Sequence, residues 1–294
     1  MIQTINPNFR VFRDDLYPFL LGGNKGRKMM SIVNLIREKK YNAIVTTGGI
    51  SSNHCRSVSI ICKQNNWNCT LVLHGNKKKF YSLNGNSLII RSMNPKIVFC
   101  NDYEISEKMD FSMEKYKQDG FRPYYLWGGG HTLEGGLAYI DALEELNIYC
   151  IENRWFPDYI FLASGTGSTQ AGIISGLDKF RLHSQVIGIS IARKSESAIK
   201  IINEFYINLN NYYKIDFMDR EIIVLDDYLF GGYEKFNNKL KSISDSAIKD
   251  YGFILDTTYS GKAFFGMHHF IKKNNLAEKN ILFWHTGGNL NYLS

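Results

Sequence analysis

The stretch Ser164-Gly165-Thr166-Gly167-Ser168-Thr169-Gln170-Ala171-Gly172 decides the fold, because it joins an apolar segment to a run of small residues. The apolar segment, residues 159–163, has the composition of a β-strand, and the small residues predict a helix. Hydroxyl groups and free amides at the start of such a helix can form a cup for a phosphate. The stretch lacks the ending of a Walker A loop and the third fixed glycine of a dinucleotide-binding fingerprint. It therefore predicts a phosphate-binding turn of another kind.

Short apolar segments alternate with amphipathic ones along the chain. The apolar segments predict strands at 43–47, 70–74, 97–99, 159–163, 186–190, 222–225 and 281–285. The amphipathic segments predict helices at 27–40, 133–146, 240–251 and 262–274. The glycine-rich segment 119–136 interrupts this alternation, and we interpret it as the crossing between two α/β units. The pattern as a whole predicts an α/β fold with mostly parallel sheets.

The composition is that of a globular protein. The 294 residues are enough for two domains, and a net charge of +7 is too modest to suggest nucleic acid as a partner. No apolar run is long enough to span a membrane, and residues 1–15 lack the apolar centre of a signal peptide. Five cysteines without a CxxC pair predict reduced thiols in a cytoplasmic protein and no metal site.

The segment Gly22-Gly23-Asn24-Lys25-Gly26-Arg27-Lys28 is expected to be a loop immediately before a helix that begins at Arg27. Its glycines allow a sharp turn and a close approach to a ligand. Arg27 and Lys28 would then lie at a positively polarised helix N-terminus, which favours an anion. Lys25 alone would be an ordinary surface lysine, but beside an anion site it becomes a candidate for Schiff-base chemistry.

Three further segments combine glycine with hydroxyl groups. Residues 47–54 (TGGISSNH) follow a predicted strand, and the first-turn amides with Ser51 and Ser52 can bind a carboxylate. Serine is also a common N-cap whatever the function, so both interpretations stay open for this segment. Residues 257–262 (TTYSGK) and 285–288 (HTGG) are expected at the C-terminal ends of strands, where open α/β sheets bind ligands. Taken alone, each of these two is better explained as a plain turn, since glycine and serine are common turn residues.

Together the five segments resemble the fold-type-II pyridoxal-phosphate (PLP) enzymes, and among them the D-cysteine desulfhydrases and 1-aminocyclopropane-1-carboxylate (ACC) deaminases. The resemblance runs in the same order from Arg13-Asp14-Asp15 to the His285 segment and rests on GGNK-x-RK, GGI-x-SN, TGSTQAG and Y-x-GK. It implies a tryptophan-synthase-β-like fold with two three-layer α/β/α domains. We expect residues 1–27 and 137–294 to form the large PLP-binding domain and residues 28–136 the small domain.

The resemblance also implies roles for single residues. Lys25 resembles the lysine that holds PLP and then takes the α-proton of the substrate, helped by burial and by the charges of Arg27 and Lys28, which would lower its pKa. Ser52 and Tyr259 resemble the other catalytic residues, and Asn53 resembles the partner of the cofactor's 3′-oxygen. Further cofactor contacts are implied for Lys28, Gly165, Thr166, Gly167, Ser168, Thr169 and Ser260. Substrate contacts are implied for Ser52, Asn53, His54, Tyr233, Tyr259 and Thr286.

Three positions distinguish the two activities. ACC deaminases place an acid after the active-site tyrosine, where this chain has Ser260, whose hydroxyl can only hydrogen-bond to the pyridine nitrogen. His54 and Thr286 also resemble the desulfhydrases. We therefore predict β-elimination of the D-cysteine type, giving pyruvate, ammonia and sulfide, in preference to ACC opening to 2-oxobutyrate and ammonia. A PLP-dependent β-replacement on another amino acid stays open, while the intact Lys25, Ser52 and Tyr259 disfavour a PLP-binding protein without turnover.

Two stretches depart from the family pattern. Arg13 comes early in the chain, so the lead segment that helps to close the substrate site is expected to be missing. Residues 76–120, expected in the small domain over the substrate, follow the pattern poorly. Both departures leave room for a different small amino acid as substrate. By resemblance, we also expect a homodimer.

Overall fold

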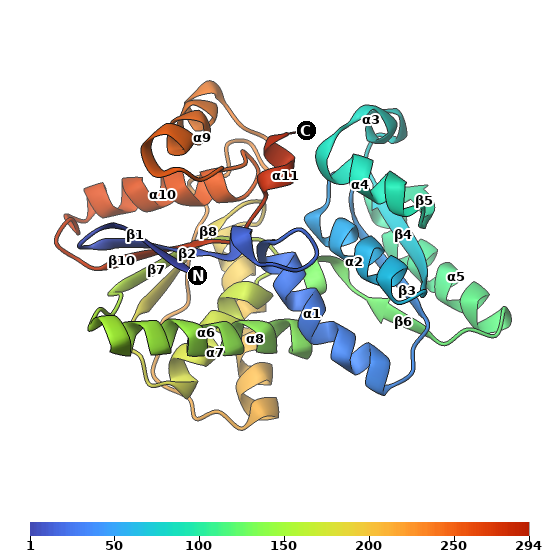
Figure 1. Ribbon diagram of the computed structural model, residues 1–294, viewed down its shortest axis with the longest axis horizontal. Coiled ribbons are helices and arrows are strands. Elements are labelled where there is room, and N and C mark those ends of the chain that lie inside the picture. Colours follow the sequence, from blue (N-terminus) through green and yellow to red (C-terminus); the bar gives the residue numbers. More distant parts are fainter. Residues whose placement is uncertain (294) are drawn as a thin grey trace.

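The computed structural model describes residues 1–293, which form two lobes side by side (Figure 1). The larger lobe is built on a six-stranded sheet with the strand order β1-β2-β10-β7-β8-β9. Only β1 and β2 pair antiparallel, and the other neighbours are parallel. The strands are β1 (Ile2–Asn6), β2 (Phe9–Arg13), β7 (Tyr159–Ser164), β8 (Gln185–Ser190), β9 (Ile223–Leu225) and β10 (Ile281–His285).

Helices cover both faces of this sheet. On one side lie α6 (Leu133–Asn153), α7 (Ser168–Lys179) and α8 (Ser195–Tyr213), and on the other lie α9 (Asn238–Tyr251) and α10 (Ser260–Lys273) (Figure 1). Successive residues of a strand point to opposite faces. Leu162 of β7 accordingly belongs to the core under α6 and α7, and Phe161 to the core under α10. The larger lobe therefore has the predicted three layers.

The smaller lobe is built on a parallel four-stranded sheet with the order β5-β4-β3-β6. Its strands are β3 (Ala43–Gly49), β4 (Asn68–His74), β5 (Lys96–Cys100) and β6 (Pro123–Leu126). One face is covered by α1 (Gly23–Glu38), α2 (Asn53–Gln64), α3 (Lys77–Ser82) and α4 (Gly85–Met93). The other face packs on α5 (Ile105–Gln118), where Met109 meets Val45 and Val72. This lobe is three-layered as well.

Two long helices connect the lobes. Helix α1 packs against α6 of the larger lobe and against α2 of the smaller one. The expected domain boundaries, at 27/28 and 136/137, fall inside α1 and α6, so the chain passes between the lobes along these helices. The division of the chain stays a prediction. Short elements complete the fold: η1 (Asp14–Leu16), η2 (Asp102–Glu104), η3 (Gly128–Gly130) and α11 (Asn289–Tyr292).

The structure corrects the predicted elements in three places. The strands β1, β2 and β6 were not predicted, since each is short and the first two carry polar residues at several positions. The Lys25 segment is not a loop, because α1 begins at Gly23. Residues 257–262 do not follow a strand, since residues 252–256 form none, and they lead instead into α10. All seven predicted strands and all four predicted helices are present within residues 1–293.

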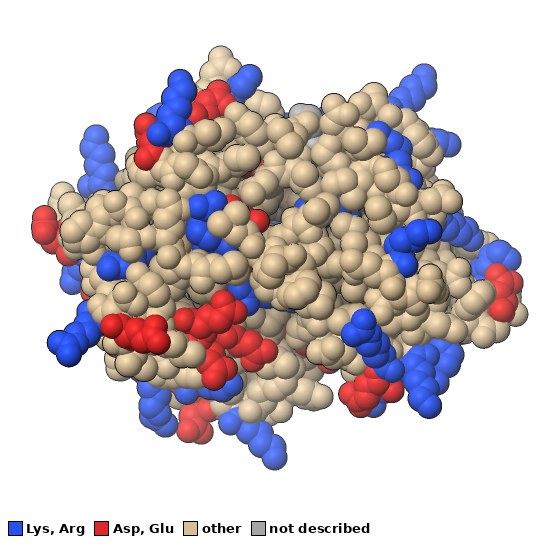
Figure 2. Space-filling view, in the orientation of Figure 1, with Lys and Arg blue, Asp and Glu red and all other residues tan. Residues whose placement is uncertain are grey.

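Charged side chains are unevenly distributed on the face shown in Figure 2. Lysine and arginine are scattered over this face and along its outline, and acidic side chains gather over α6. Nothing on this face resembles the continuous basic stripe of a nucleic-acid-binding protein. Within residues 1–293, no helix has the length and hydropathy that crossing a membrane requires.

Candidate cofactor-binding site

All five glycine-rich segments meet at one cavity. The first turns of α1, α2 and α7 contribute to its wall together with the residues that follow β7 and β10. The ends of parallel strands and the beginnings of helices are the usual place for a ligand in such folds. The lining residues are Asn24, Lys25, Asn53, Ala163, Ser164, Gly165, Thr166, Gly167, Thr169, Gln170, Tyr259, Thr286, Gly287 and Gly288.

Lys25 lies in the first turn of α1 with its side chain in the cavity. Gly22, with φ 73°, turns the chain into the helix, and a side chain at this position would lie 2.5 Å from the carbonyl oxygen of Asp15. The ammonium nitrogen of Lys25 donates to the carbonyl oxygen of Gly129 at 3.3 Å. Burial disfavours the charged form and lowers the pKa of Lys25 to about 8. Lys25 is therefore easier to deprotonate than an ordinary lysine.

Arg27 plays a different part from the one the sequence suggested. Its guanidinium donates to Asp14 at 2.8 Å and to Glu145 at 2.6 Å, so its charge is balanced away from the cavity. The pKa of Lys25 is lowered by burial, and neither Arg27 nor Lys28 contributes to the shift. The expectation that Arg27 acts on Lys25 is wrong for this reason. Arg27 instead ties the helix that carries Lys25 to the buried carboxylate of Asp14.

The segment after β7 presents hydrogen-bond donors to the cavity. Gly167 precedes α7 with φ 91° and no side chain caps the helix, so the first amides of α7 have no partner within the helix. The hydroxyl of Ser164 is buried and has no hydrogen-bond partner. Lys28 donates to the hydroxyl of Ser168 at 2.8 Å and so brings a further hydrogen-bond donor to the same turn. Burial, and then the charge of Lys25, hold the pKa of Lys28 well below its usual value.

Asn53 lies at the start of α2 and lines the cavity. Hydrogen bonds hold its side-chain amide in one orientation. Its carbonyl oxygen accepts from Arg56 at 3.3 Å and from Asn86 at 2.9 Å. Its NH₂ group is consequently the part that is left to donate into the cavity. Arg56 and Asn86 are themselves buried, at 3% and 0% exposure. The sequence interpretation missed both, and only their polar character on otherwise buried helix faces could have drawn attention to them.

Asn53→Asp is expected to weaken PLP binding about tenfold or more, because it replaces the free donor with a negatively charged acceptor. Arg56 and Asn86 can still pair with one carboxylate oxygen, so the fold should be kept. The dissociation constant can be measured by titrating the apoprotein with PLP and following absorbance. A constant equal to that of the wild type would show that Asn53 does not contact the cofactor.

Ser52 and His54 flank Asn53 but do not line the cavity. The hydroxyl of Ser52 accepts from the amide of Cys55 at 3.2 Å, which is the N-cap role. The ring of His54 is buried, with Nε2 2.8 Å from the hydroxyl of Thr46. Burial lowers the pKa of His54 to about 3, so the ring is neutral. Their roles toward a substrate stay predictions.

Two tyrosines meet at the large-lobe side of the cavity. The hydroxyl groups of Tyr233 and Tyr259 are 2.6 Å apart. Burial and the neighbouring Tyr233 raise the pKa of Tyr259 well above its usual value, so Tyr259 keeps its proton at neutral pH. The structure thus brings the predicted Tyr233 beside Tyr259, although the two lie on different segments of the chain.

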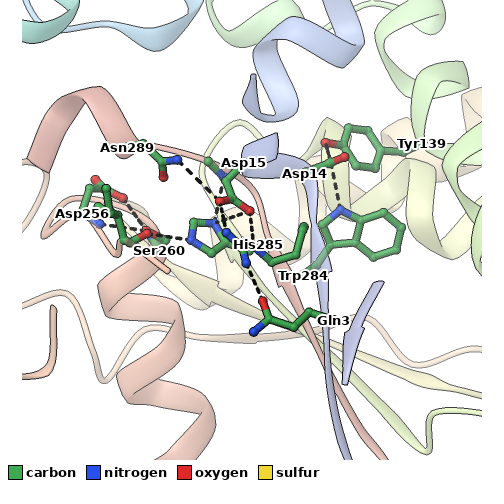
Figure 3. A network of polar contacts seen from close by, with 12 residues as sticks. Gln3, Asp14, Asp15, Tyr139, Asp256, Ser260, Trp284, His285 and Asn289 are labelled. Atoms are coloured by element: carbon green, nitrogen blue, oxygen red, sulfur yellow. Dashed lines mark hydrogen bonds and ion pairs between the residues drawn. The ribbon is translucent and has the colours of Figure 1, made fainter. Parts of the chain in front are cut away.

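Ser260 is held by a buried acid that the sequence interpretation missed. Its hydroxyl donates to Asp256 at 2.7 Å (Figure 3). The Asp256 carboxylate also accepts from the amides of Thr258, Tyr259 and Ser260. Ser260 is only 1% exposed and does not line the cavity. Asp256 therefore fixes the turn that carries Tyr259, and the role of Ser260 toward the cofactor stays a prediction.

A second polar network lies at the C-terminal end of β10, next to the cavity wall. Asp15 accepts from Arg13 at 2.7 Å and lies 3.9 Å from the ring of His285 (Figure 3). His285 is the last residue of β10, directly before Thr286 of the cavity wall. The carbonyl oxygen of Thr286 accepts from the amide of Asn24 at 2.8 Å, which joins this wall to the turn of Lys25. Asp15 and His285 thus position two sides of the cavity.

The cavity residues fit the requirements of PLP. The unpaired amides at α7 and the free hydroxyl of Ser164 suit a phosphate, and the NH₂ group of Asn53 suits the 3′-oxygen. Lys25, with a pKa of about 8, can act as the amine that bonds to the aldehyde. PLP would therefore be held by Lys25, Asn53 and the segment 165–169.

Comparisons with known proteins agree with this fit. D-cysteine desulfhydrase of Klebsiella pneumoniae subsp. pneumoniae is 27% identical over 281 residues, covering 94% of this chain and 85% of the relative. A Pyrococcus furiosus protein provisionally named 1-aminocyclopropane-1-carboxylate deaminase is 30% identical over 289 residues, covering 97% of this chain and 86% of the relative. The crystal structure of an ACC deaminase homologue is 28% identical with a TM-score of 0.87 and covers 97% of this chain and 86% of that one.

More distant structures share the fold alone. Threonine deaminase isoform 2 from Solanum lycopersicum is 14% identical with a TM-score of 0.67, covering 96% of this chain and 75% of that one. These likenesses confirm the predicted fold-type-II architecture. The family profile described as "Pyridoxal-phosphate dependent enzyme" matches residues 5–287. The chain therefore belongs to the family of pyridoxal-phosphate-dependent enzymes.

Proposed function

We propose that this enzyme is a PLP-dependent lyase that eliminates the β-substituent of a small amino acid, as in the conversion of D-cysteine to pyruvate, ammonia and sulfide. The observation that carries the proposal is that a lysine with a lowered pKa shares one cavity with an anion cup and a protonated tyrosine. The relatives named D-cysteine desulfhydrase support the same reaction.

The residues around the cavity supply binding and proton transfer. PLP, when bound, supplies an electron sink that weakens the bonds at the α-carbon. Lys25 in its uncharged form takes the α-proton, and its lowered pKa makes that form accessible near neutral pH. Tyr259 keeps its proton and donates a hydrogen bond on the side of the leaving group. Ser52 and the amides that open α2 bind the substrate carboxylate.

Ser260 favours elimination over ring opening. The residue after Tyr259 is a neutral hydroxyl whose hydrogen is donated to Asp256, so it is not an acid that could protonate the pyridine nitrogen. A weaker electron sink is sufficient for loss of the α-proton and the β-substituent. ACC opening is the second candidate, because the Pyrococcus relative and the ACC deaminase homologue resemble this chain over nearly its whole length.

The test is a product assay on the PLP-bound enzyme with D-cysteine, L-cysteine, D-serine and ACC supplied separately. Pyruvate and sulfide from D-cysteine would support the proposal. Production of 2-oxobutyrate from ACC alone would replace it with ring opening. Loss of pyruvate on addition of a second thiol, with a new thioether amino acid as product, would indicate β-replacement.

The lowered pKa of Lys25 predicts how PLP uptake depends on pH. Only the uncharged amine of Lys25 would react with the aldehyde of PLP, and a pKa of about 8 means that this form is scarce below pH 7 and dominant above pH 9. The initial rate of PLP uptake by the apoprotein should therefore rise with pH and level off, with its midpoint near pH 8. Stopped-flow absorbance measures this rate. A midpoint near pH 10.5 would mean that Lys25 titrates as an ordinary lysine.

We further propose that the enzyme is a cytoplasmic homodimer. All five cysteines are free thiols, which fits a reducing compartment. The dimer follows from the resemblance to fold-type-II enzymes. Light scattering of the purified protein would give the mass of the assembly, to be compared with 33.8 kDa for one chain.

A further inference from the structure

Arg56 is a buried cation without an acid to balance it. It lies in α2 and is 3% exposed, and the other buried arginine of residues 1–293 is Arg27, at 6%. Arg27 pairs with Asp14 at 2.8 Å and with Glu145 at 2.6 Å. In the same part of the chain, no carboxylate forms an ion pair with Arg56. The two buried arginines therefore differ in what neutralises them.

The hydrogen bonds of Arg56 go to neutral groups. Its Nη1 atom donates to the side-chain oxygens of Asn53 and Asn86, both at 3.3 Å. Its Nη2 atom donates to the carbonyl oxygen of Gly22 at 3.1 Å and to the hydroxyl of Ser57 at 3.2 Å. Its Nε atom is buried and has no hydrogen-bond partner. Neutral dipoles thus hold the guanidinium in place, but its charge stays uncompensated.

Arg56 keeps its charge in this environment. Burial lowers the pKa of Arg56 to about 10, which still leaves the guanidinium protonated at neutral pH. A buried charge without a partner is strongly destabilising, because it has lost its hydration and gained no opposite charge. Such a charge indicates an anion that joins the site from outside the chain.

Asn53 connects Arg56 to the cofactor cavity. Asn53 lines the cavity, whereas Arg56 lies behind it and does not. A cation bonded to the carbonyl oxygen of an amide polarises that amide and makes its NH₂ group a stronger donor. The bond to Gly22 also ties Arg56 to the turn that precedes Lys25. Arg56 thus contacts two of the parts that would hold PLP.

We propose that Arg56 is a positioning residue that acts through Asn53 to keep the 3′-oxygen of bound PLP anionic. Coulomb attraction and the strengthened hydrogen bond from Asn53 both favour the negative charge on that oxygen. The phosphate, which is the other anionic group of PLP, has its own cup at residues 165–169. The inference rests on Asn53 as a contact of PLP and holds for any amino-acid substrate.

The test is a pH titration of the visible absorption band of the PLP-bound protein in the wild type, Arg56→Gln and Arg56→Lys. The band changes when the adduct of PLP and Lys25 loses its proton. A nearby cation disfavours that proton, so removing the cation raises the pH of the midpoint. We expect Arg56→Gln to raise the midpoint by about one pH unit or more. Arg56→Lys, which keeps the charge, should raise it by less than about half as much.

The other titratable groups at the site do not blur the comparison. Burial lowers the pKa of His54 to about 3, so its ring is neutral throughout the titration. Burial also raises the pKa values of Tyr233 and Tyr259, which keep their protons. Lys28 is the same in every variant. The difference between the midpoints therefore reports the charge at position 56.

Ser57→Ala is the matched control, because it removes one hydrogen-bond partner of Arg56 and keeps the charge. Its midpoint should stay within about a third of a pH unit of the wild type. An unchanged midpoint in Arg56→Gln would overturn the proposal. Equal shifts in Arg56→Gln and Arg56→Lys, or in Arg56→Gln and Ser57→Ala, would show that Arg56 only supports the fold.

A measurement on the wild type decides the matter if Arg56→Gln does not fold. The probe is 4′-deoxypyridoxine 5′-phosphate, which has the hydroxyl of PLP but no aldehyde to react with Lys25. Its ultraviolet spectrum reports the ionisation of that hydroxyl. We expect the midpoint of ionisation to be lower by about one pH unit or more in the bound probe than in the free probe. Equal midpoints would refute the role of Arg56. Neither titration requires turnover, so failure of the proposed elimination would leave this inference standing.

Discussion

Lys25→Ala is expected to remove the visible absorption band of the PLP-bound protein and to lower turnover by at least about a thousandfold. One side chain both bonds to the cofactor and takes the α-proton, so its loss affects both steps. The fold should be kept, because Lys25 makes a single hydrogen bond, at 3.3 Å to Gly129. The absorption spectrum and a keto-acid assay measure the two effects.

A lysine at the C-terminal end of the same helix provides the control. Lys39 directly follows α1 and its side chain is 57% exposed, so Lys39→Ala should leave both the spectrum and turnover unchanged. Turnover by Lys25→Ala within tenfold of the wild type would show that another group takes the α-proton. A retained absorption band would mean that another lysine holds the cofactor.

Asp14→Asn is expected to destabilise the protein by about 3–5 kcal/mol, because it leaves the buried Arg27 without its main partner. The Asp14 side chain is fully buried and accepts from Arg27 at 2.8 Å. It also accepts from Trp284 at 2.9 Å and from Tyr139 at 2.5 Å (Figure 3). An asparagine would place its NH₂ group in the position of a carboxylate oxygen, although Arg27, Trp284 and Tyr139 all donate hydrogen bonds there. For a chain of this size the loss corresponds to a drop in Tm of about 10 °C, measurable by thermal unfolding.

Glu145, the other partner of Arg27, tests whether the burial of Asp14 is the reason for the large expected loss of stability. Glu145 also pairs with Arg27, but its side chain is 45% exposed. Glu145→Gln should therefore cost about 1 kcal/mol or less, since water screens an exposed pair. Equal losses of stability in the two variants would contradict the assignment of Asp14 as the anchor of α1.

The sequence predicted the parts of the site that depend on local pattern. Each of the five segments combines glycines with hydroxyl or amide side chains next to a predicted strand or helix, and all five reach one cavity. Lys25 was found because it lies in a glycine-rich turn beside a predicted anion site. Asn53 was assigned its role through the family resemblance. The β1–β2 hairpin escaped prediction because its strands are short and carry polar residues, so the alternation of apolar residues is weak.

The missed residues act through contacts that no local pattern of the sequence marks. Asp256 holds the turn of Tyr259, Asn86 orients Asn53, and Asp14 anchors α1 through Arg27. Each is a buried polar residue whose partner lies elsewhere in the fold or is a backbone amide, and no local pattern marks it. Arg27 was assigned to the cavity from its neighbours in sequence, whereas the helix turns its guanidinium toward Asp14. Such pairings depend on packing between elements.

The most direct measurement maps the covalent link between protein and cofactor. The PLP-bound protein is reduced with borohydride, digested and analysed by mass spectrometry. We predict one modified peptide, with the PLP mass on Lys25. Modification of the neighbouring Lys28 or of Lys262 instead of Lys25, or no modified peptide at all, would contradict the assignment of this cavity as the cofactor site.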